Sequence, residues 1–357
     1  MKRTIYLFLF FISLTTSNTF AQSNKELANT KAHLAVRLMD DGKIEESITI
    51  LKECMKLDPK NYDYEYEYIY AHYLKEDYES VIKLGKKLSK KKNANYEIFA
   101  LIGNAYDEFD NPKEAIKYYD KGIKKFPDVG LLYLEKGILF EKRGEYGTAA
   151  YYYSSGIIAE PSYASNYYRI SGLYLESDNK VPGLIYGELF MNIERGSERT
   201  VRMSELLYKT FSEGVTFEND STRSFNLCKN NFNLADFKKY ETFPLCLIFS
   251  LRFAPTLSNI NEINLANLSE VREKYIPLYI ENDFKSYPII LFEYHQKMID
   301  AGVFNAYNHY IFQIGAEEEF QQWLEENKEE YDEFLEWYTQ PENILTPTKE
   351  KYFIFNY

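Results

Sequence analysis

The residue types best suited to metal or acid–base chemistry are sparse in this chain and form no known pattern. Its four histidines are His33, His72, His295 and His309. None is spaced from another as in a helical zinc motif such as H-E-x-x-H. His295 and His309 fall on two segments expected to be facing helices and could approach each other, but we expect structural roles for them. The sequence therefore predicts no metal site.

Nucleophile and phosphate-binding motifs are also missing from the sequence. It contains no G-x-S-x-G elbow, no phosphate-binding loop and no dinucleotide fingerprint. Its 54 acidic residues leave a glycosidase-like carboxylate pair open, since such a pair has no local signature. Nothing in the sequence singles out such a pair. We therefore expect no enzyme, no catalytic residues and no cofactor.

The three cysteines do not make a disulfide framework, because their number is odd and low. Cys54 falls where the repeat described below requires a small buried residue, which predicts a core thiol. Cys228 and Cys246 can pair in an oxidising compartment. The sequence leaves that pairing open.

The overall charge argues against nucleic acid as a partner. The formal net charge is -12, with 45% hydrophobic and 27% charged residues, which is typical of a globular protein. Nucleic acids bind clustered positive charge. The basic run at residues 86–92 is the one local exception, and we expect most of it at the solvated end of a helix.

The first residues have the features of an export signal. Met1-Lys2-Arg3 is positive, residues 5–14 are mostly apolar, and Thr19-Phe20-Ala21 favours cleavage after Ala21. The apolar run is short for a stable membrane span, although an N-terminal anchor is the alternative. No stretch of 18 apolar residues follows residue 21. We expect a signal peptide over 1–21 and an exported, periplasmic or extracellular protein with no integral membrane segment after cleavage.

The strongest signal in the sequence is an internal repeat of 34 residues. This repeat predicts the structural elements that would position any functional site. Five positions recur at this step, namely Gly103 and Gly137, Ala115 and Ala149, Tyr119 and Tyr153, Gly122 and Gly156, and Pro127 and Pro161. The same register extends in both directions. It predicts an array over 28–197, with clean repeats at 28–61, 62–95, 96–129 and 130–163 and a degenerate one at 164–197.

Each repeat has the pattern of a helical hairpin. In 96–129, Phe99, Ile102, Gly103 and Tyr106 form one apolar stripe at helical spacing. Asp110-Asn111-Pro112 then interrupts the helix, and Asn111 is expected to cap the next one. Small residues recur where two helix backbones must approach closely. A single hairpin cannot bury its apolar face alone, so the pattern predicts stacked neighbours.

This pattern resembles the tetratricopeptide repeat family, whose motif combines L-G-x2-Y, A-x3-F and a closing Pro. Ile102-Gly103, Tyr106, Ala115, Tyr119 and Pro127 match it in one repeat. The resemblance implies an all-α fold, an α-solenoid of helical hairpins with a concave groove, followed here by a mostly helical region over 198–357. It also implies a non-enzymatic scaffold for protein–protein interaction.

In the family, the groove is lined by the first helix of each hairpin. Carried onto this chain, the candidate groove positions are Tyr66, Tyr70, Tyr73, Asn104, Asp107, Glu108, Leu134, Ile138, Glu141 and Tyr168. Tyrosine gives a large contact area with few rotors, and Asp107 and Glu108 favour a partner carrying Lys or Arg. We expect a protein or peptide segment, basic and apolar in character. Ala100 stands where a carboxylate clamp would need lysine, which argues against such a clamp.

The clean register ends at residue 197. Beyond it the sequence predicts the following elements: helices at 204–211, 243–253 and 271–280, the last starting at Asn267 and kinked or shortened by Pro277, a β-hairpin over 215–227, a helical hairpin over 288–314 that resembles a decayed repeat, and a long helix at 316–338. The last helix has one aromatic and one acidic side, so we expect it to cap the array. The alternative function is an accessory carrier or receptor that binds a small ligand or glycan through this region.

Overall fold

The computed structural model describes residues 24–219, 222–228, 245–258 and 260–355. The predicted signal peptide at 1–21 lies outside these residues. The chain divides into two compact units, one ending at Pro127 and the other beginning at Asp128. We call them the N-terminal unit and the C-terminal unit. Helices dominate both, so the fold is all-α apart from one short hairpin in the described part of the chain.

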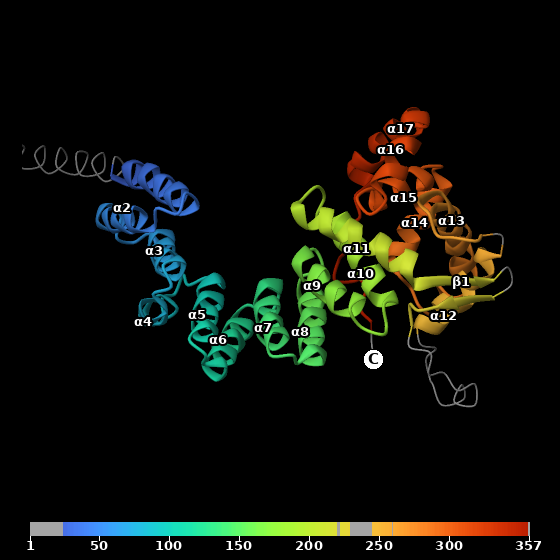
Figure 1. Cartoon of the computed structure of the whole chain (residues 1–357). Coiled ribbons are helices and arrows are strands. Elements are labelled where there is room, and N and C mark those ends of the chain that lie inside the picture. The colour runs from blue at the N-terminus through green and yellow to red at the C-terminus, as the bar shows by residue number, and fades with distance from the viewer. Residues whose placement is uncertain (1–23, 220–221, 229–244, 259, 356–357) are drawn as a thin grey trace, which may run out of the picture. The chain divides into compact units, whose positions relative to one another are not determined.

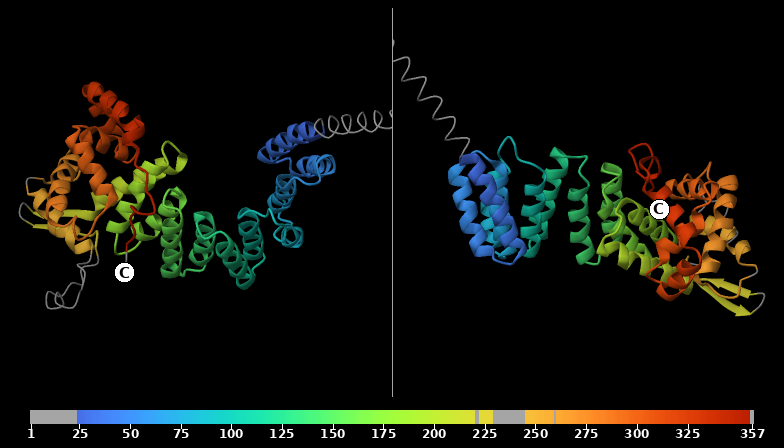
Figure 2. Two further views of the ribbon diagram at one scale, coloured as in Figure 1. Left: turned by 180° about the vertical axis from the view of Figure 1, so that it is seen from behind. Right: turned by 90° about the horizontal axis from the view of Figure 1, so that it is seen from above.

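The N-terminal unit is a series of helices joined by short loops, and consecutive helices lie side by side (Figures 1 and 2). Residues 24–40 are helical. The helices that follow are α2 (Ile44–Leu57), α3 (Tyr62–Leu74), α4 (Tyr78–Leu88), α5 (Glu97–Glu108) and α6 (Pro112–Lys125).

Local chemistry sets where these helices begin. The Asn61 and Asp77 side chains accept hydrogen bonds from the first-turn amides of α3 and α4, at 2.9 and 3.1 Å. Asn111 accepts from the Glu114 amide at 3.3 Å and Pro112 occupies the first turn of α6, which confirms the predicted cap. Asp110, just before this cap, has a φ of 50°. Such left-handed residues let the chain reverse between two helices.

The close helix contacts predicted from small residues are present in both units. A Cβ added at Gly103 would overlap the Tyr119 ring, and one at Gly137 would overlap the Tyr153 ring. The two contacts are equivalent, since both partners shift by 34 residues. Cys54 is also a buried thiol as predicted, and its Sγ donates to the Ala28 carbonyl oxygen at 3.3 Å.

The C-terminal unit begins with two further hairpins and continues into a compact helical region. The helices and 3₁₀ turns are α7 (Gly130–Lys142), α8 (Tyr146–Ala159), α9 (Ala164–Leu175), α10 (Val181–Ile193), α11 (Glu198–Gly214), α12 (Leu245–Phe253), η2 (Ala254–Leu257), α13 (Leu265–Asn282), α14 (Ile290–Asp300), α15 (Phe304–Phe312), α16 (Glu317–Glu326), α17 (Lys328–Thr339) and η3 (Pro341–Asn343). Helix α10 is the centre of the unit, because it contacts α9, α11, α12 and α14 and is buried over nearly its whole length.

The predicted β-hairpin is confirmed. Strands β1 (Val215–Asn219) and β2 (Thr222–Phe225) pair in antiparallel fashion, with an irregularity between Phe217 and Asn219. A disulfide joins Cys228 to Cys246, whose Cα atoms are 5.6 Å apart. It ties the end of the hairpin to the first turn of α12. The start of the helix predicted at 243–253 lies outside the described residues, and the rest of it is α12.

The prediction for the helix around residue 271 was wrong about its start and about shortening by Pro277. Helix α13 begins earlier, because the Asn264 side chain, and not Asn267, caps it by accepting from the Asn267 amide at 2.9 Å. Pro277 does not shorten it, since α13 continues to Asn282. The proline ring lies on the exposed side of the helix. The burial of neighbouring Ile276 and Tyr279 sustains the helix past the missing amide.

The single helix predicted over 316–338 is also wrong, because it is broken into α16 and α17. Asn327 has a non-helical backbone (φ -123°, ψ 31°), and its side chain donates to the Trp323 carbonyl oxygen at 2.8 Å. This local bond competes with the helix. The predicted aromatic side still faces inward, with Phe320, Phe334 and Tyr338 buried.

The predicted helical hairpin at 288–314 is confirmed as α14 and α15. The C-terminal segment beyond η3 returns to the start of the unit. The Phe353 ring packs on Tyr186 with centroids 4.9 Å apart, and Lys349 pairs with Asp128 at 2.5 Å. Among the described helices, none combines the length and the apolar character that a membrane crossing requires.

Candidate functional site

A row of tyrosine rings follows one side of α3. Tyr66, Tyr70 and Tyr73 are spaced by four and then three residues, so they share one face of the helix. The Tyr66 and Tyr70 ring centroids are 6.4 Å apart, as are those of Tyr70 and Tyr73, and both pairs are nearly parallel. Tyr78 of α4 meets the end of the row, with its centroid 5.6 Å from that of Tyr73. The structure thus brings together the first three predicted groove residues.

The row borders acidic side chains of α3 and α5. Burial and the nearby Glu97 carboxylate raise the pKa of Tyr66. The same two causes raise the pKa of Glu67. Asn95 holds Glu97 in place by donating to its Oε2 at 2.6 Å. The face of α3 next to α5 is therefore aromatic with a negative edge.

The predicted groove residues on α5 differ in how far they are exposed and hydrogen-bonded within the protein. The Asn104 side chain accepts a hydrogen bond from the Tyr119 hydroxyl at 2.6 Å. Part of its hydrogen-bonding capacity is therefore used within its own hairpin. Asp107 is half-buried and Glu108 is exposed, and both lie in the last turn of α5, at the opposite end of the helix from Glu97. All six predicted residues from Tyr66 to Glu108 belong to the N-terminal unit.

The other four predicted residues belong to the C-terminal unit and are largely engaged in packing. Leu134 is only 7% exposed and is part of the core, so it is not a groove side chain. Ile138 packs against the same core. Glu141 accepts from the Tyr153 hydroxyl and lies 3.5 Å from Arg169. The Tyr168 ring packs on Phe190 with centroids 5.0 Å apart.

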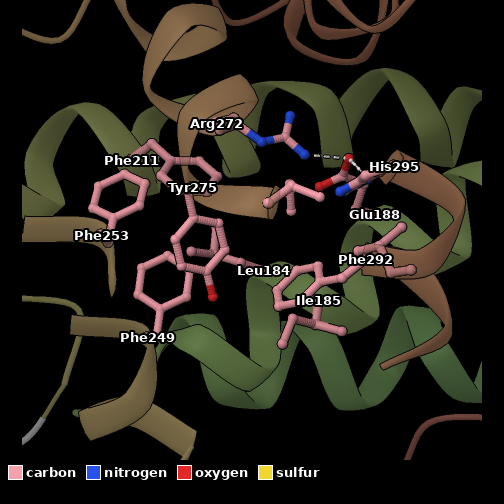
Figure 3. A pocket seen from close by; sticks show the side chains of 12 residues that line it. Leu184, Ile185, Glu188, Phe211, Phe249, Phe253, Arg272, Tyr275, Phe292 and His295 are labelled. Carbon is pink, nitrogen blue, oxygen red and sulfur yellow. Dashed lines mark hydrogen bonds and ion pairs between the residues drawn. The ribbon is translucent and has the colours of Figure 1, made fainter. Parts of the chain in front are cut away.

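A buried polar cluster in the C-terminal unit was not predicted (Figure 3). Glu188 of α10 accepts from Nη2 of Arg272 of α13 at 2.5 Å, and Nε2 of His295 of α14 lies 2.8 Å from the same carboxylate oxygen. The Tyr307 hydroxyl donates to that oxygen at 2.8 Å. All four side chains are nearly inaccessible to solvent. Helices α10, α13, α14 and α15 therefore meet at one carboxylate.

The electrostatics of this cluster follow from burial and pairing. Burial alone raises the pKa of Glu188, but Arg272 and His295 outweigh it and lower that pKa to about 2. Burial lowers the pKa of His295, and the Glu188 carboxylate opposes this only in part. Glu188 is therefore a carboxylate and His295 a neutral imidazole near pH 7. The one sequence signal for the cluster is that Glu188 is the single charged residue of a helix that is mostly apolar.

The cluster borders an aromatic cavity of about 20 Å³, lined among others by Phe249, Tyr275 and Phe292. This volume has room for about one water molecule. It is too small for the small ligand or glycan of the alternative function. His295 and His309 do not share a site, because His309 stacks on Trp323 with ring centroids 4.0 Å apart and its Nδ1 lies 2.9 Å from the Asn305 carbonyl oxygen. Within the described residues no group of three His, Cys, Asp or Glu side chains is placed to hold a metal.

Comparison with known proteins gives solved structures as its only matches. No protein-family model and no curated protein matches the chain. PilF of Pseudomonas aeruginosa is similar with a TM-score of 0.42 and 15% identity, over 53% of this chain and 86% of PilF. A thermophilic TPR protein of Thermus thermophilus has a TM-score of 0.42 and 16% identity, over 50% of this chain and 98% of that protein. PilW, described as a type IV pilus biogenesis factor, has a TM-score of 0.41 and 18% identity, over 51% of this chain and 84% of PilW.

These likenesses are too distant to carry an argument about function. The architecture is instead described from the chain's own features, which are a 34-residue register, paired helices and equivalent glycine–tyrosine contacts. With these features, the chain is an all-α protein built on repeated helical hairpins.

Proposed function

We propose that this chain is a non-enzymatic scaffold that binds a protein or peptide segment on the first-helix side of its hairpins. The tyrosine row of α3 carries the proposal. Its rings form a continuous aromatic surface from Tyr66 to Tyr78 that is only half-buried. Aromatic side chains of this kind bind with little loss of conformational freedom, because each has only two torsions to fix.

The negative edge of this surface favours a segment that combines apolar and basic residues. Glu97 and Glu67 lie beside the row, and Asp107 and Glu108 lie further along α5. Opposite charges across an interface raise specificity and the rate of encounter more than affinity. We therefore expect Lys or Arg near an apolar anchor in the bound segment, and an association rate that falls as salt is added.

The proposed location is the cell envelope or the exterior. The positive and apolar N-terminal sequence supports export. The disulfide between Cys228 and Cys246 supports it independently, because such bonds persist in oxidising compartments. Fractionation of the producing cells, with the redox state of the two cysteines measured in each fraction, tests this part of the proposal.

The test of the binding surface is crosslinking of the whole chain in its native cells, followed by pull-down. Tyr70→Ala should remove the captured partner, whereas Tyr70→Phe should retain it, since the ring supplies the contact area. Asp107→Ala should weaken capture. Asp120→Ala, on the exposed side of α6, is its matched control and should have no effect. Equal capture by Tyr70→Ala and the wild type would contradict the proposal.

The basic character of the segment needs a separate measurement. A peptide array should contain sets with apolar anchors flanked by Lys or Arg, by Glu, or by Gln. We expect binding to the first set and much weaker binding to the second. An array that shows no preference for basic flanks would leave a scaffold but remove the charge complementarity from the proposal.

A further inference from the structure

The outward side of α8 differs from the equivalent side of every other second helix in the hairpins. Helix α8 contains no charged residue over its 14 positions. Tyr151 and Ile158 lie two turns apart on it and are 64% and 44% exposed. Gly147 and Ser155 occupy the same side. We call these four residues the α8 face.

The 34-residue register gives the residues that other hairpins place at the same positions. The position of Tyr151 is occupied by Thr49, Lys83 and Lys117 in the three preceding hairpins, and that of Ile158 by Lys56, Lys90 and Lys124. All six of these side chains are exposed. The position of Gly147 is occupied by Glu45, Glu79 and Lys113, which are exposed as well. The chain therefore places charges where this side of a hairpin meets water.

The next hairpin shows what an uncharged side of this kind is used for. Ile185 of α10 occupies the position of Tyr151 and is only 2% exposed. It lines the cavity described above with Phe249 of α12 and Phe292 of α14. Val181, at the position of Gly147, is fully buried. In α10, loss of the charges thus goes together with coverage by the apolar faces of other helices.

The α8 face also lacks charges, but Tyr151 and Ile158 are exposed to solvent where the equivalent side of α10 is covered by other helices. A charged partner surface would lose its hydration there without gaining a counterion, which is unfavourable. An apolar surface would gain the burial of Tyr151 and Ile158. The Tyr151 ring is also held in place, because it meets Tyr152 edge-on with centroids 5.2 Å apart, and Tyr152 stacks on Phe140 at 5.4 Å.

From these observations we propose that the α8 face binds an amphipathic helix of another protein through an apolar, uncharged side of that helix. The occupant is the intermolecular counterpart of α12 and α14, which cover the same register positions on α10. This surface is separate from the tyrosine row of α3 and uses no charge. The inference therefore does not depend on the proposed function.

The test measures binding of three synthetic stapled helices of equal length to the whole chain by fluorescence anisotropy. Their contact sides carry Leu and Phe, Lys, or Glu. We expect the Leu/Phe helix to bind and the other two to bind at least tenfold more weakly. The double substitution Tyr151→Lys and Ile158→Lys recreates the residues of α6 and should weaken the Leu/Phe helix at least tenfold.

Two controls make the result specific. Lys117→Ala with Lys124→Ala changes the equivalent side of α6 and should leave binding unchanged, as should Tyr70→Ala on α3. Circular dichroism melts should show that the Tyr151 and Ile158 variant remains folded, since both side chains are exposed. The proposal is overturned if that variant binds the Leu/Phe helix as tightly as the wild type, or if the Lys or Glu helix binds equally well.

A second copy of the chain is the rival occupant. Sedimentation velocity over a range of concentrations distinguishes the two. A monomer that binds the Leu/Phe helix supports the proposal. A dimer that dissociates on substitution of Tyr151 and Ile158 would assign the α8 face to self-association and overturn it.

Discussion

Gly137 of α7 and Gly172 of α9 occupy the first helices of neighbouring hairpins, but their surroundings differ. A Cβ at Gly137 would overlap the ring of Tyr153, which is buried and bonded to Glu141. A Cβ at Gly172 would have no heavy atom within 4 Å outside its own helix backbone and chain neighbours. At the residue scale, therefore, one glycine is required by packing and the other only weakens its helix.

The two glycines predict opposite effects of the same substitution. Gly137→Ala should lower the free energy of unfolding by about 1–3 kcal/mol, because it overpacks the contact with Tyr153. Gly172→Ala should raise it by about 0.5–1 kcal/mol, because alanine restricts the unfolded chain and favours the helix. Urea unfolding of both variants measures this. Destabilisation of similar size at both positions would show that the close helix approach at Gly137 is not the cause.

His295 predicts how stability depends on pH. Its folded pKa is lowered by burial, so the unfolded chain binds a proton more readily. Stability from this group is then complete above the unfolded value of about 6.5 and is lost as the pH falls below it toward the folded pKa. Glu188, whose pKa is about 2 in the fold, adds a second loss below about pH 4.

The measurement is the free energy of unfolding between pH 7.5 and 5. We expect the wild type to lose stability over this range, and His295→Gln to be less stable at pH 7.5 but to lose less as the pH falls. His33→Gln is the control, because His33 is exposed. The same slope in wild type and His295→Gln would mean that another group controls the acid response.

At the scale of the element, α13 shows that tertiary packing can override a local break. Pro277 lies inside the helix and lacks the amide hydrogen that would reach the Glu273 carbonyl oxygen. The helix continues nevertheless, because Tyr275, Ile276 and Tyr279 are buried in the core of the C-terminal unit. Helices α16 and α17 show the opposite case. Their amphipathic sequence pattern is continuous, but the hydrogen bond from the Asn327 side chain to the Trp323 carbonyl oxygen accompanies a break between them.

Replacing Pro277 should therefore stabilise the protein. Pro277→Ala restores an amide donor inside α13 and should raise the free energy of unfolding by about 1–3 kcal/mol. Pro112→Ala is the matched control, because Pro112 sits in the first turn of α6, where no amide is needed. Chemical denaturation of the two variants decides the point, and an equal effect of both substitutions would refute the account of α13.

At the scale of the whole molecule, the disulfide is a covalent link within the C-terminal unit. It joins residues separated by 18 positions. By closing this loop covalently, the disulfide lowers the conformational entropy of the unfolded chain. Reduction, or Cys228→Ser with Cys246→Ser, should lower the free energy of unfolding by about 3 kcal/mol. Unfolding with and without reductant measures this. The double variant should not respond to reductant, although Cys54 remains, and a response would point to that thiol.

The predicted groove also has to be judged at this scale. Its ten residues were chosen by one register, but six lie in the N-terminal unit and four in the C-terminal unit. Tyr66, Tyr70 and Tyr73 form one surface, as a helical spacing of four and three requires. Leu134, chosen by the same rule, is part of the core. A register gives the side of a helix on which a residue lies, but not whether a neighbouring element covers that side.

The sequence by itself determined the hairpins, because their causes are local and recur. Apolar stripes and small residues opposite tyrosines act within one repeat and recur at a step of 34 residues, and the Asp77 cap of α4 recurs at Asn111 of α6. Only the tertiary structure decided the burial of α10 and the cluster of Glu188, Arg272 and His295. Glu188 and Arg272 are 84 positions apart, and no periodicity connects them. Their contact depends on how α10, α13 and α14 pack together, so it is a property of the folded core and cannot be read from any one segment.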